Sequence, residues 1–210
     1  MKKALLIILS LVAILPAIAG ISEDFYYGKF NSAFNSLNLA MTQSIAKNGP
    51  VSSWDWTKSE TEIFNQYLRP YLNIQKTCAE NDGSCWAASA YMAMNQHAAD
   101  APDGLHKSYI LSDGTYLVFE ARNNDCLGKN DGKVKSCAFV WVDTTGEKFP
   151  NVMGRDYFKF YIHPKSSQIL PVGYPHSKEI DMAQINKSCN PDSTGNFCGA
   201  KLLVEKRMNY

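Results

Sequence analysis

The cysteines of this chain place the strongest limit on its fold, because they fall into three pairs that are close in sequence. The pairs enclose segments rich in Asn, Asp, Gly, Ser and Lys, which are typical of exposed loops. Three local disulfides are the simplest pairing for such loops in an oxidising compartment. A zinc site is the alternative, but it expects C-x-x-C spacing or a neighbouring His, and the sequence has neither. The predicted disulfide pairs are Cys78 with Cys85, Cys126 with Cys137, and Cys189 with Cys198.

The N-terminal residues have the pattern of an export signal. Lys2 and Lys3 precede an apolar stretch over residues 4–19, and a basic start followed by an apolar core is typical of translocation signals. Cleavage after Ala19 would leave a soluble exported protein that begins at Gly20, whereas retention would make the stretch a membrane anchor. At about 1.5 Å per residue the stretch spans roughly 24 Å, less than a bilayer core of about 30 Å, so an anchor requires the helix to continue past Gly20.

The segment after the apolar stretch predicts such a continuation. Apolar residues recur at spacings of three and four from Phe30 to Ile45, with polar residues between them, which is the pattern of an amphipathic helix. Asn48-Gly49-Pro50 should end this helix, because Gly is favoured just past a helix end and Pro cannot continue it. We therefore expect residues 1–19 to be a signal or anchor segment, and residues 20–210 to form one globular domain that includes the amphipathic helix.

A second helix is expected after residue 57. Thr57-Lys58-Ser59-Glu60 has the spacing of a capping box at a helix start. Pro70 should kink or shorten the helix that follows, because it lacks the backbone N–H that a helix interior needs. Residues 199–208 fit either a short helix or a strand.

The middle of the chain predicts strands. The turn Ser112-Asp113-Gly114 separates residues 109–111 from residues 115–120, and both flanks are rich in β-branched and aromatic side chains, as in a hairpin. Further strands are expected at 138–143 and 157–162, and connections of this length favour antiparallel pairing. The predicted fold class is therefore α+β, with a long N-terminal α-helix packed on an antiparallel β-sheet and loops tied by disulfides.

Gly83-Ser84-Cys85-Trp86 is a local match to a catalytic motif. It resembles the segment around the nucleophile of papain-like cysteine peptidases, where the Cys opens a helix whose N-terminus lowers the thiol pKa. This interpretation makes Cys85 the nucleophile and needs a distant His as its base. His163 and His176 are candidates, but both lie closer than the family spacing of about 130 residues, and Ala79 stands where the family has its oxyanion Gln. A cysteine peptidase is therefore an alternative, and no catalytic residue is assigned.

Two turns that follow and precede predicted strands carry oxygen-bearing side chains, in Asp143-Thr144-Thr145-Gly146 and Gly154-Arg155-Asp156. Alternating oxygen ligands in such loops can hold Ca²⁺, which makes Asp143 and Asp156 weak calcium candidates. Asp-Thr-Thr-Gly is equally good turn chemistry, and no other cofactor is expected. The 21 Lys and Arg nearly balance the 20 Asp and Glu, so the charge does not predict a nucleic-acid partner.

A set of short motifs runs through most of the chain. The set comprises Ala13-Ile14-Leu15-Pro16-Ala17, the run Tyr27 to Lys47, Ser112-Asp113-Gly114, Cys126 and Cys137, Val142-Asp143 with Gly146, Pro150-Asn151, Gly154-Arg155-Asp156 before Phe158, Cys198-Gly199-Ala200-Lys201 and Met208-Asn209-Tyr210. Together these motifs resemble type IV pilin-like proteins, a family that includes the pseudopilins of type II secretion. The resemblance implies a long N-terminal helix, half in a membrane or filament core and half packed on an antiparallel sheet, and a role in assembly.

The processing signal of that family is absent here. Pilin precursors carry a Gly followed by Phe-Thr-Leu and a Glu at the fifth mature residue, and Lys3-Ala4-Leu5-Leu6-Ile7-Ile8 contains no such Gly, Phe or Glu. The apolar stretch is then expected to act as a secretion signal or an anchor.

The expected function is that of an exported or membrane-anchored pilin-like structural subunit of a bacterial secretion or surface-filament system, not an enzyme. The resemblance implies other pilin-like subunits or secretion machinery as partners, and the membrane through residues 4–19 if these are retained. The protein would be anchored in the inner membrane with a periplasmic or extracellular domain, or secreted if residues 1–19 are cleaved. A soluble exported binding module is a further alternative.

Overall fold

The computed structural model describes residues 22–80, 82, 85–86, 91–102, 104–129, 135–146, 148–176 and 179–210. The predicted signal or anchor stretch lies outside these residues. The helices are α1 (Glu23–Asn48), α2 (Glu60–Tyr67), α3 (Asn123–Cys126), α4 (Met182–Ser188) and α5 (Cys198–Glu205), with short 3-10 helices η1 (Val51–Ser53) and η2 (Arg69–Tyr71). The strands are β1 (Ile74–Cys78), β2 (Ser108–Leu111), β3 (Tyr116–Ala121), β4 (Ala138–Asp143), β5 (Tyr157–His163) and β6 (Gln168–Pro171).

Helix α1 has defined caps at both ends. Ser22 is the N-cap, and its hydroxyl accepts a hydrogen bond from the Phe25 N–H at 3.3 Å. The helix ends at Asn48 because Gly49 adopts a φ of 80°, a conformation that favours glycine. The predicted stop at Asn48-Gly49-Pro50 is thus confirmed. Among the described residues, no helix has the length and hydropathy needed to cross a membrane.

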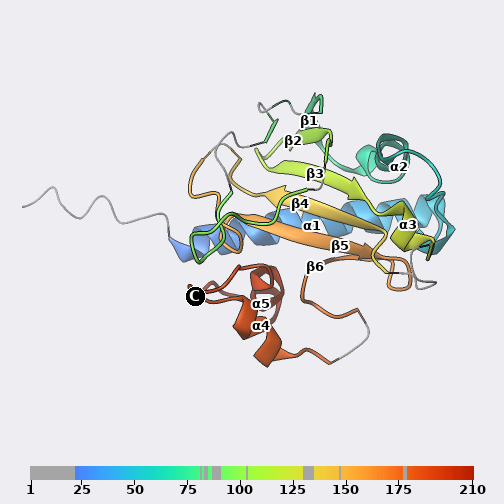
Figure 1. Ribbon diagram of the computed structural model, residues 1–210. Helices are drawn as coiled ribbons and strands as arrows, with labels where there is room; N and C mark the ends of the chain where they lie inside the picture. The colour runs from blue at the N-terminus through green and yellow to red at the C-terminus, as the bar shows by residue number, and fades with distance from the viewer. Residues whose placement is uncertain are drawn as a thin grey trace, which may run out of the picture.

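The six strands form one antiparallel sheet in chain order, β1 to β6. Each strand pairs with the next, and the hairpin predicted around Ser112-Asp113-Gly114 joins β2 to β3. Figure 1 shows α1 lying along one face of this sheet. The predicted α+β class, with a long helix packed on an antiparallel sheet, is therefore confirmed.

The main hydrophobic core lies between α1 and the sheet. Phe30 of α1 is fully buried, and its ring centroid lies 4.8 Å from that of Phe158 and 6.0 Å from that of Phe160. Leu37, two turns further along the helix, is 1% exposed. Burying each such side chain contributes about 1.5–3 kcal/mol, so this apolar stripe is the physical reason that α1 docks on the sheet.

Local features of two other helices refine the sequence predictions. The capping box belongs to Ser59 and Glu62 and not to Thr57 and Glu60, because the Ser59 hydroxyl accepts from the Glu62 N–H while the Glu62 carboxylate accepts from the Ser59 N–H. Helix α2 ends at Tyr67, before Pro70, as predicted. The tail, which fitted either a helix or a strand, forms helix α5.

The three disulfides join the cysteines in the predicted sequence-adjacent pairs. Cys189 follows α4 and Cys198 begins α5, so their bridge holds these two helices together. The prediction of loops tied by local disulfides agrees with this structure.

A second, smaller core covers part of the opposite face of the sheet. It contains Trp141 of β4 and Tyr157 of β5, which alternate along their strands with the residues that face α1. Tyr91 packs over them, with 4.1 Å between the ring centroids of Tyr91 and Tyr157. The segment that contains Tyr91 therefore shields the outer face of the sheet.

Candidate functional site

The structure places Cys85 in a disulfide and not in a catalytic arrangement. Its sulfur is bonded to that of Cys78, and the residue is fully buried. The candidate base His163 stacks on His176, with 3.8 Å between the ring centroids, and its Nδ1 accepts a hydrogen bond from the Lys165 N–H at 3.2 Å. A nucleophilic thiolate at Cys85 would first require reduction of the bridge.

The two calcium candidates come together at the end of the sheet. Asp143 is the last residue of β4, Asp156 directly precedes β5, and both are fully buried. The Thr145 hydroxyl lies between them, 3.3 Å from Asp143 Oδ1 and 2.9 Å from Asp156 Oδ2. The fold thus brings the two calcium candidates into one cluster.

The Asp143 carboxyl already has protein partners on both oxygens. Oδ1 accepts from the N–H groups of Thr145 at 3.0 Å and Gly146 at 2.9 Å, and Oδ2 accepts from the Tyr91 hydroxyl at 2.8 Å. Burial, followed by the charge of the nearby Asp156, raises the pKa of Asp143 to about 7, although the hydrogen bonds act in the opposite direction. The Asp143 carboxyl is therefore partly protonated near neutral pH.

Both oxygens of the Asp156 carboxyl also accept hydrogen bonds from within the protein. Its Oδ1 accepts from the Val152 N–H at 2.7 Å, and its Oδ2 accepts from the Asn151 N–H at 2.9 Å and from the Thr145 hydroxyl. Burial raises the pKa of Asp156 as well. Calcium would have to displace these donors, and no group of three or more His, Cys, Asp or Glu residues suited to a metal occurs in the described parts of the chain. The pair fits a brace for the β4–β5 connection and does not fit an open calcium site.

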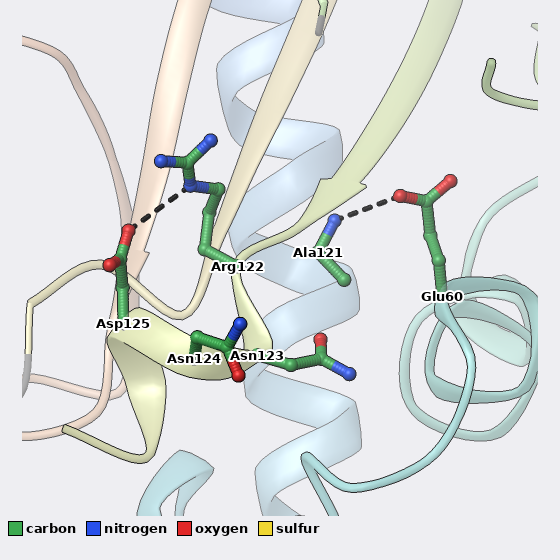
Figure 2. Close-up of a pocket in the computed structure, with 6 residues that line it drawn as sticks. All are labelled: Glu60, Ala121, Arg122, Asn123, Asn124 and Asp125. Atoms are coloured by element: carbon green, nitrogen blue, oxygen red, sulfur yellow. Dashed lines mark hydrogen bonds and ion pairs between the residues drawn. The ribbon is translucent and has the colours of Figure 1, made fainter. Parts of the chain in front are cut away.

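A polar pocket of about 420 Å³ lies where β3 ends. Figure 2 shows Glu60 reaching from the start of α2 toward the end of β3, with the asparagines of α3 below it. The tertiary structure brings Glu60 to this site, because the other lining residues lie about 60 positions later in the chain. The residues that line the pocket are Glu60, Ala121, Arg122, Asn123, Asn124 and Asp125.

Glu60 fixes one wall of this pocket. Its Oε2 accepts from the Ala121 N–H at 3.0 Å, and both of its oxygens lie 2.9 Å from Nδ1 of His106. The side chain of Glu60 is 25% exposed. The carboxylate therefore ties the N-terminus of α2 to the end of β3 and still has contact with solvent.

Arg122 fixes the opposite wall. Its Nε donates to Asp125 Oδ2 at 3.2 Å, and its Nη1 donates to Glu120 Oε1 at 3.1 Å. The Asn123 amide donates to the Lys58 carbonyl at 2.8 Å. The described lining residues supply carboxylate, amide and guanidinium groups, so this pocket is equipped to offer hydrogen bonds to a small polar molecule.

The sequence contained only a faint signal for this pocket. Asn123-Asn124-Asp125 follows a strand and precedes a cysteine, which is also the composition of an ordinary polar loop. The participation of Glu60 could not be inferred, because it depends on where α2 docks against the sheet.

Comparisons with known proteins returned no match to any family model, curated protein or solved structure. The family resemblance of the sequence therefore stands on the motifs of this chain alone.

Proposed function

We propose that this chain is an exported or membrane-anchored pilin-like structural subunit of a secretion or surface-filament system. The observation that carries the proposal is the position of α1. This helix begins at Glu23, a few residues after the apolar stretch 4–19, and docks along the sheet through one apolar face. A chain built in this way has an apolar segment for a membrane or filament core and a separately stabilised folded part.

The disulfides support the exported part of this proposal. All six cysteines are paired, and such a set of structural disulfides is typical of oxidising compartments. The first bridge involves the last residue of β1, the second links the end of α3 to the residue before β4, and the third connects α4 to α5.

A soluble exported binding module is a second candidate, and the polar pocket in Figure 2 is the observation that favours it. Its walls are held by fixed carboxylate and guanidinium groups, as expected for a site that orients a small polar ligand. The two candidates differ in whether residues 1–19 remain attached.

The mature N-terminus separates the two candidates. We would purify the native protein from cells, measure its intact mass with and without reduction, and wash the membranes with alkaline carbonate. The subunit proposal expects a chain that retains the apolar stretch and stays with washed membranes or sheared filaments. A soluble protein that begins at Gly20 would overturn the anchored subunit and favour the binding module. The mass increase on reduction would report the three disulfides in the same experiment.

A peptidase assay tests the remaining alternative. The structural-subunit proposal expects no hydrolysis of peptide substrates by the purified protein, with or without reductant. Hydrolysis that is lost in Cys85→Ala but kept in Cys189→Ala would overturn the proposal, because the second variant also breaks a disulfide and leaves the proposed nucleophile in place.

A further inference from the structure

The segment that follows β6 packs against two residues of β5. Tyr161 and His163 are two positions apart on this strand, so their side chains point to the same face of the sheet. The Tyr161 hydroxyl donates to the Tyr174 carbonyl at 2.8 Å, and the His163 ring stacks on that of His176 with 3.8 Å between the ring centroids. The later part of residues 172–176 is thus held against β5 by a hydrogen bond and by two stacked imidazoles.

The hydrogen bonding of His163 requires a neutral ring. The residue is 8% exposed, and its Nδ1 accepts from the backbone N–H of Lys165 at 3.2 Å. An Nδ1 that accepts carries no proton, so the neutral ring has its proton on Nε2. A second proton can add only to Nδ1, where it would face the Lys165 N–H and break this hydrogen bond.

The charges around His163 also disfavour its protonation. Of the described residues, the titratable groups that act on its ring are His176, which stacks on it, and Lys165, which lies in the β5–β6 turn. The 3-10 helix η1, which contacts this turn through Val51, carries no titratable side chain. Burial first, and then His176 and Lys165, lower the pKa of His163 below its ordinary value of 6.5.

The β5–β6 turn depends on the same residue. The His163 carbonyl accepts from the Ser167 N–H at 3.1 Å, and the Ser167 Oγ accepts from the Val51 N–H at 3.2 Å. Ser167 has a φ of 50°, an uncommon conformation for a residue with a Cβ, which its surroundings must maintain. Loss of the hydrogen bond from Lys165 to His163 would therefore loosen the turn as well as the stack.

We propose that the stack of His163 and His176 is a pH-sensitive tie, and that protonation of His163 in mildly acid conditions releases residues 172–176 from β5. The added proton breaks the hydrogen bond from Lys165 and places a positive charge against His176. The segment forms part of the lining of a groove of about 320 Å³, so its release changes the shape of this groove. The protein then presents different surfaces in acid and in neutral surroundings.

Proton linkage gives the size and the sign of the effect. A histidine whose pKa is lower in the closed state than in the open state favours the open state as the pH falls between the two values. Within that interval the equilibrium constant for opening rises about tenfold for each pH unit. The sign is opposite to that of Asp143, whose raised pKa favours the folded protein at acid pH, so the two effects can be distinguished.

Hydrogen exchange, followed by NMR on the full chain in mild detergent from about pH 7.5 to about pH 5, tests the proposal. Below pH 6.5 the protection factors of the Lys165 and Ser167 amides should fall about tenfold per pH unit while His163 titrates. Contacts between the rings of His163 and His176 should disappear over the same range, and the amides between β3 and β4 should keep their protection. A stack that persists after His163 is protonated, or an equal loss of protection between β3 and β4, would overturn the proposal.

A matched pair of histidine variants isolates the contribution of His163. His163→Asn keeps an oxygen that can accept from the Lys165 N–H but does not titrate, so protection at Ser167 should no longer depend on pH, whatever its starting level. His97→Asn, which removes an exposed histidine of another segment, should leave the wild-type pH dependence unchanged. Acid-dependent opening that persists in His163→Asn would refute the role of His163. Membrane retention plays no part in this measurement, so its outcome is independent of the proposed assembly role.

Discussion

Replacing Asp143 with asparagine should weaken a pH dependence of stability that the structure builds into this protein, by removing the part that Asp143 contributes. The pKa of Asp143 is raised from 3.8 to about 7 by burial and by Asp156. A carboxyl whose pKa is raised on folding contributes stability that is fully present below its unfolded pKa and is lost as pH rises through its folded pKa. The wild type should therefore lose stability as the pH rises from about 4 to above 7.

The size of the effect follows from the distance between the two pKa values. Between about pH 5 and the folded pKa of about 7, the carboxyl is ionised in the unfolded chain but still protonated in the folded protein. Over this interval of roughly two pH units, at about 1.4 kcal/mol per unit, the free energy of unfolding falls by on the order of 3 kcal/mol. The side-chain amide of the Asp143→Asn variant would keep an oxygen for the N–H groups of Thr145 and Gly146 and would turn its N–H₂ toward the Tyr91 hydroxyl, which can accept. Asp143→Asn should therefore match the wild type near pH 5 and exceed its stability near pH 8.

Asp156→Asn is the matched contrast. Both Asp156 oxygens accept from backbone N–H groups, at Val152 and Asn151, so an amide N–H₂ at this position must face a donor. We expect Asp156→Asn to lower the free energy of unfolding by about 1–3 kcal/mol, even at low pH, where the Asp143 carboxyl is protonated and uncharged.

Urea unfolding followed by tryptophan fluorescence, repeated across this pH range, provides the measurement. A dependence of stability on pH that is as steep in Asp143→Asn as in the wild type, or equal stability of the two asparagine variants, would refute the reasoning. Added Ca²⁺ should not change the wild-type midpoint. A rise with Ca²⁺ that disappears in both variants would instead restore the calcium interpretation.

The remaining predictions concern the elements that hold the fold together, and urea unfolding at fixed pH measures each of them. Phe30→Ala should cost about 3–5 kcal/mol, because it leaves a cavity between α1 and the sheet, whereas Ser32→Ala on the exposed side of α1 should change stability little. Ser59→Ala should cost about 1 kcal/mol through loss of the α2 cap, and an unchanged midpoint would show that this capping box does not contribute. Gly146→Ala should be more costly than an ordinary loop substitution, because Gly146 has a φ of 65° and an added Cβ would lie 2.9 Å from the Gly114 carbonyl oxygen.

Several elements could be predicted because their signals are local. The stop of α1 depends on Gly49 and Pro50, the β2–β3 hairpin on a three-residue turn, and the disulfides on cysteines seven to eleven positions apart. Strands β1 and β6 were not predicted. They are edge strands, and the three central residues of β1 are all exposed, so no alternation of apolar and polar residues marks it.

The sequence alone determined the long amphipathic helix, the antiparallel character of the central strands and the local pairing of the cysteines, because each depends on residues a short distance apart in the chain. Only the tertiary structure decided how the oxygens of Asp143 and Asp156 are used, and that Glu60 and Arg122 line one pocket. Those arrangements depend on which segments the sheet brings together, and residue spacing carries no information about the donors that will saturate a buried carboxyl. The apolar stretch supplied the first evidence for export, and the docking of α1 directly after it is what joins that evidence to the proposed assembly role.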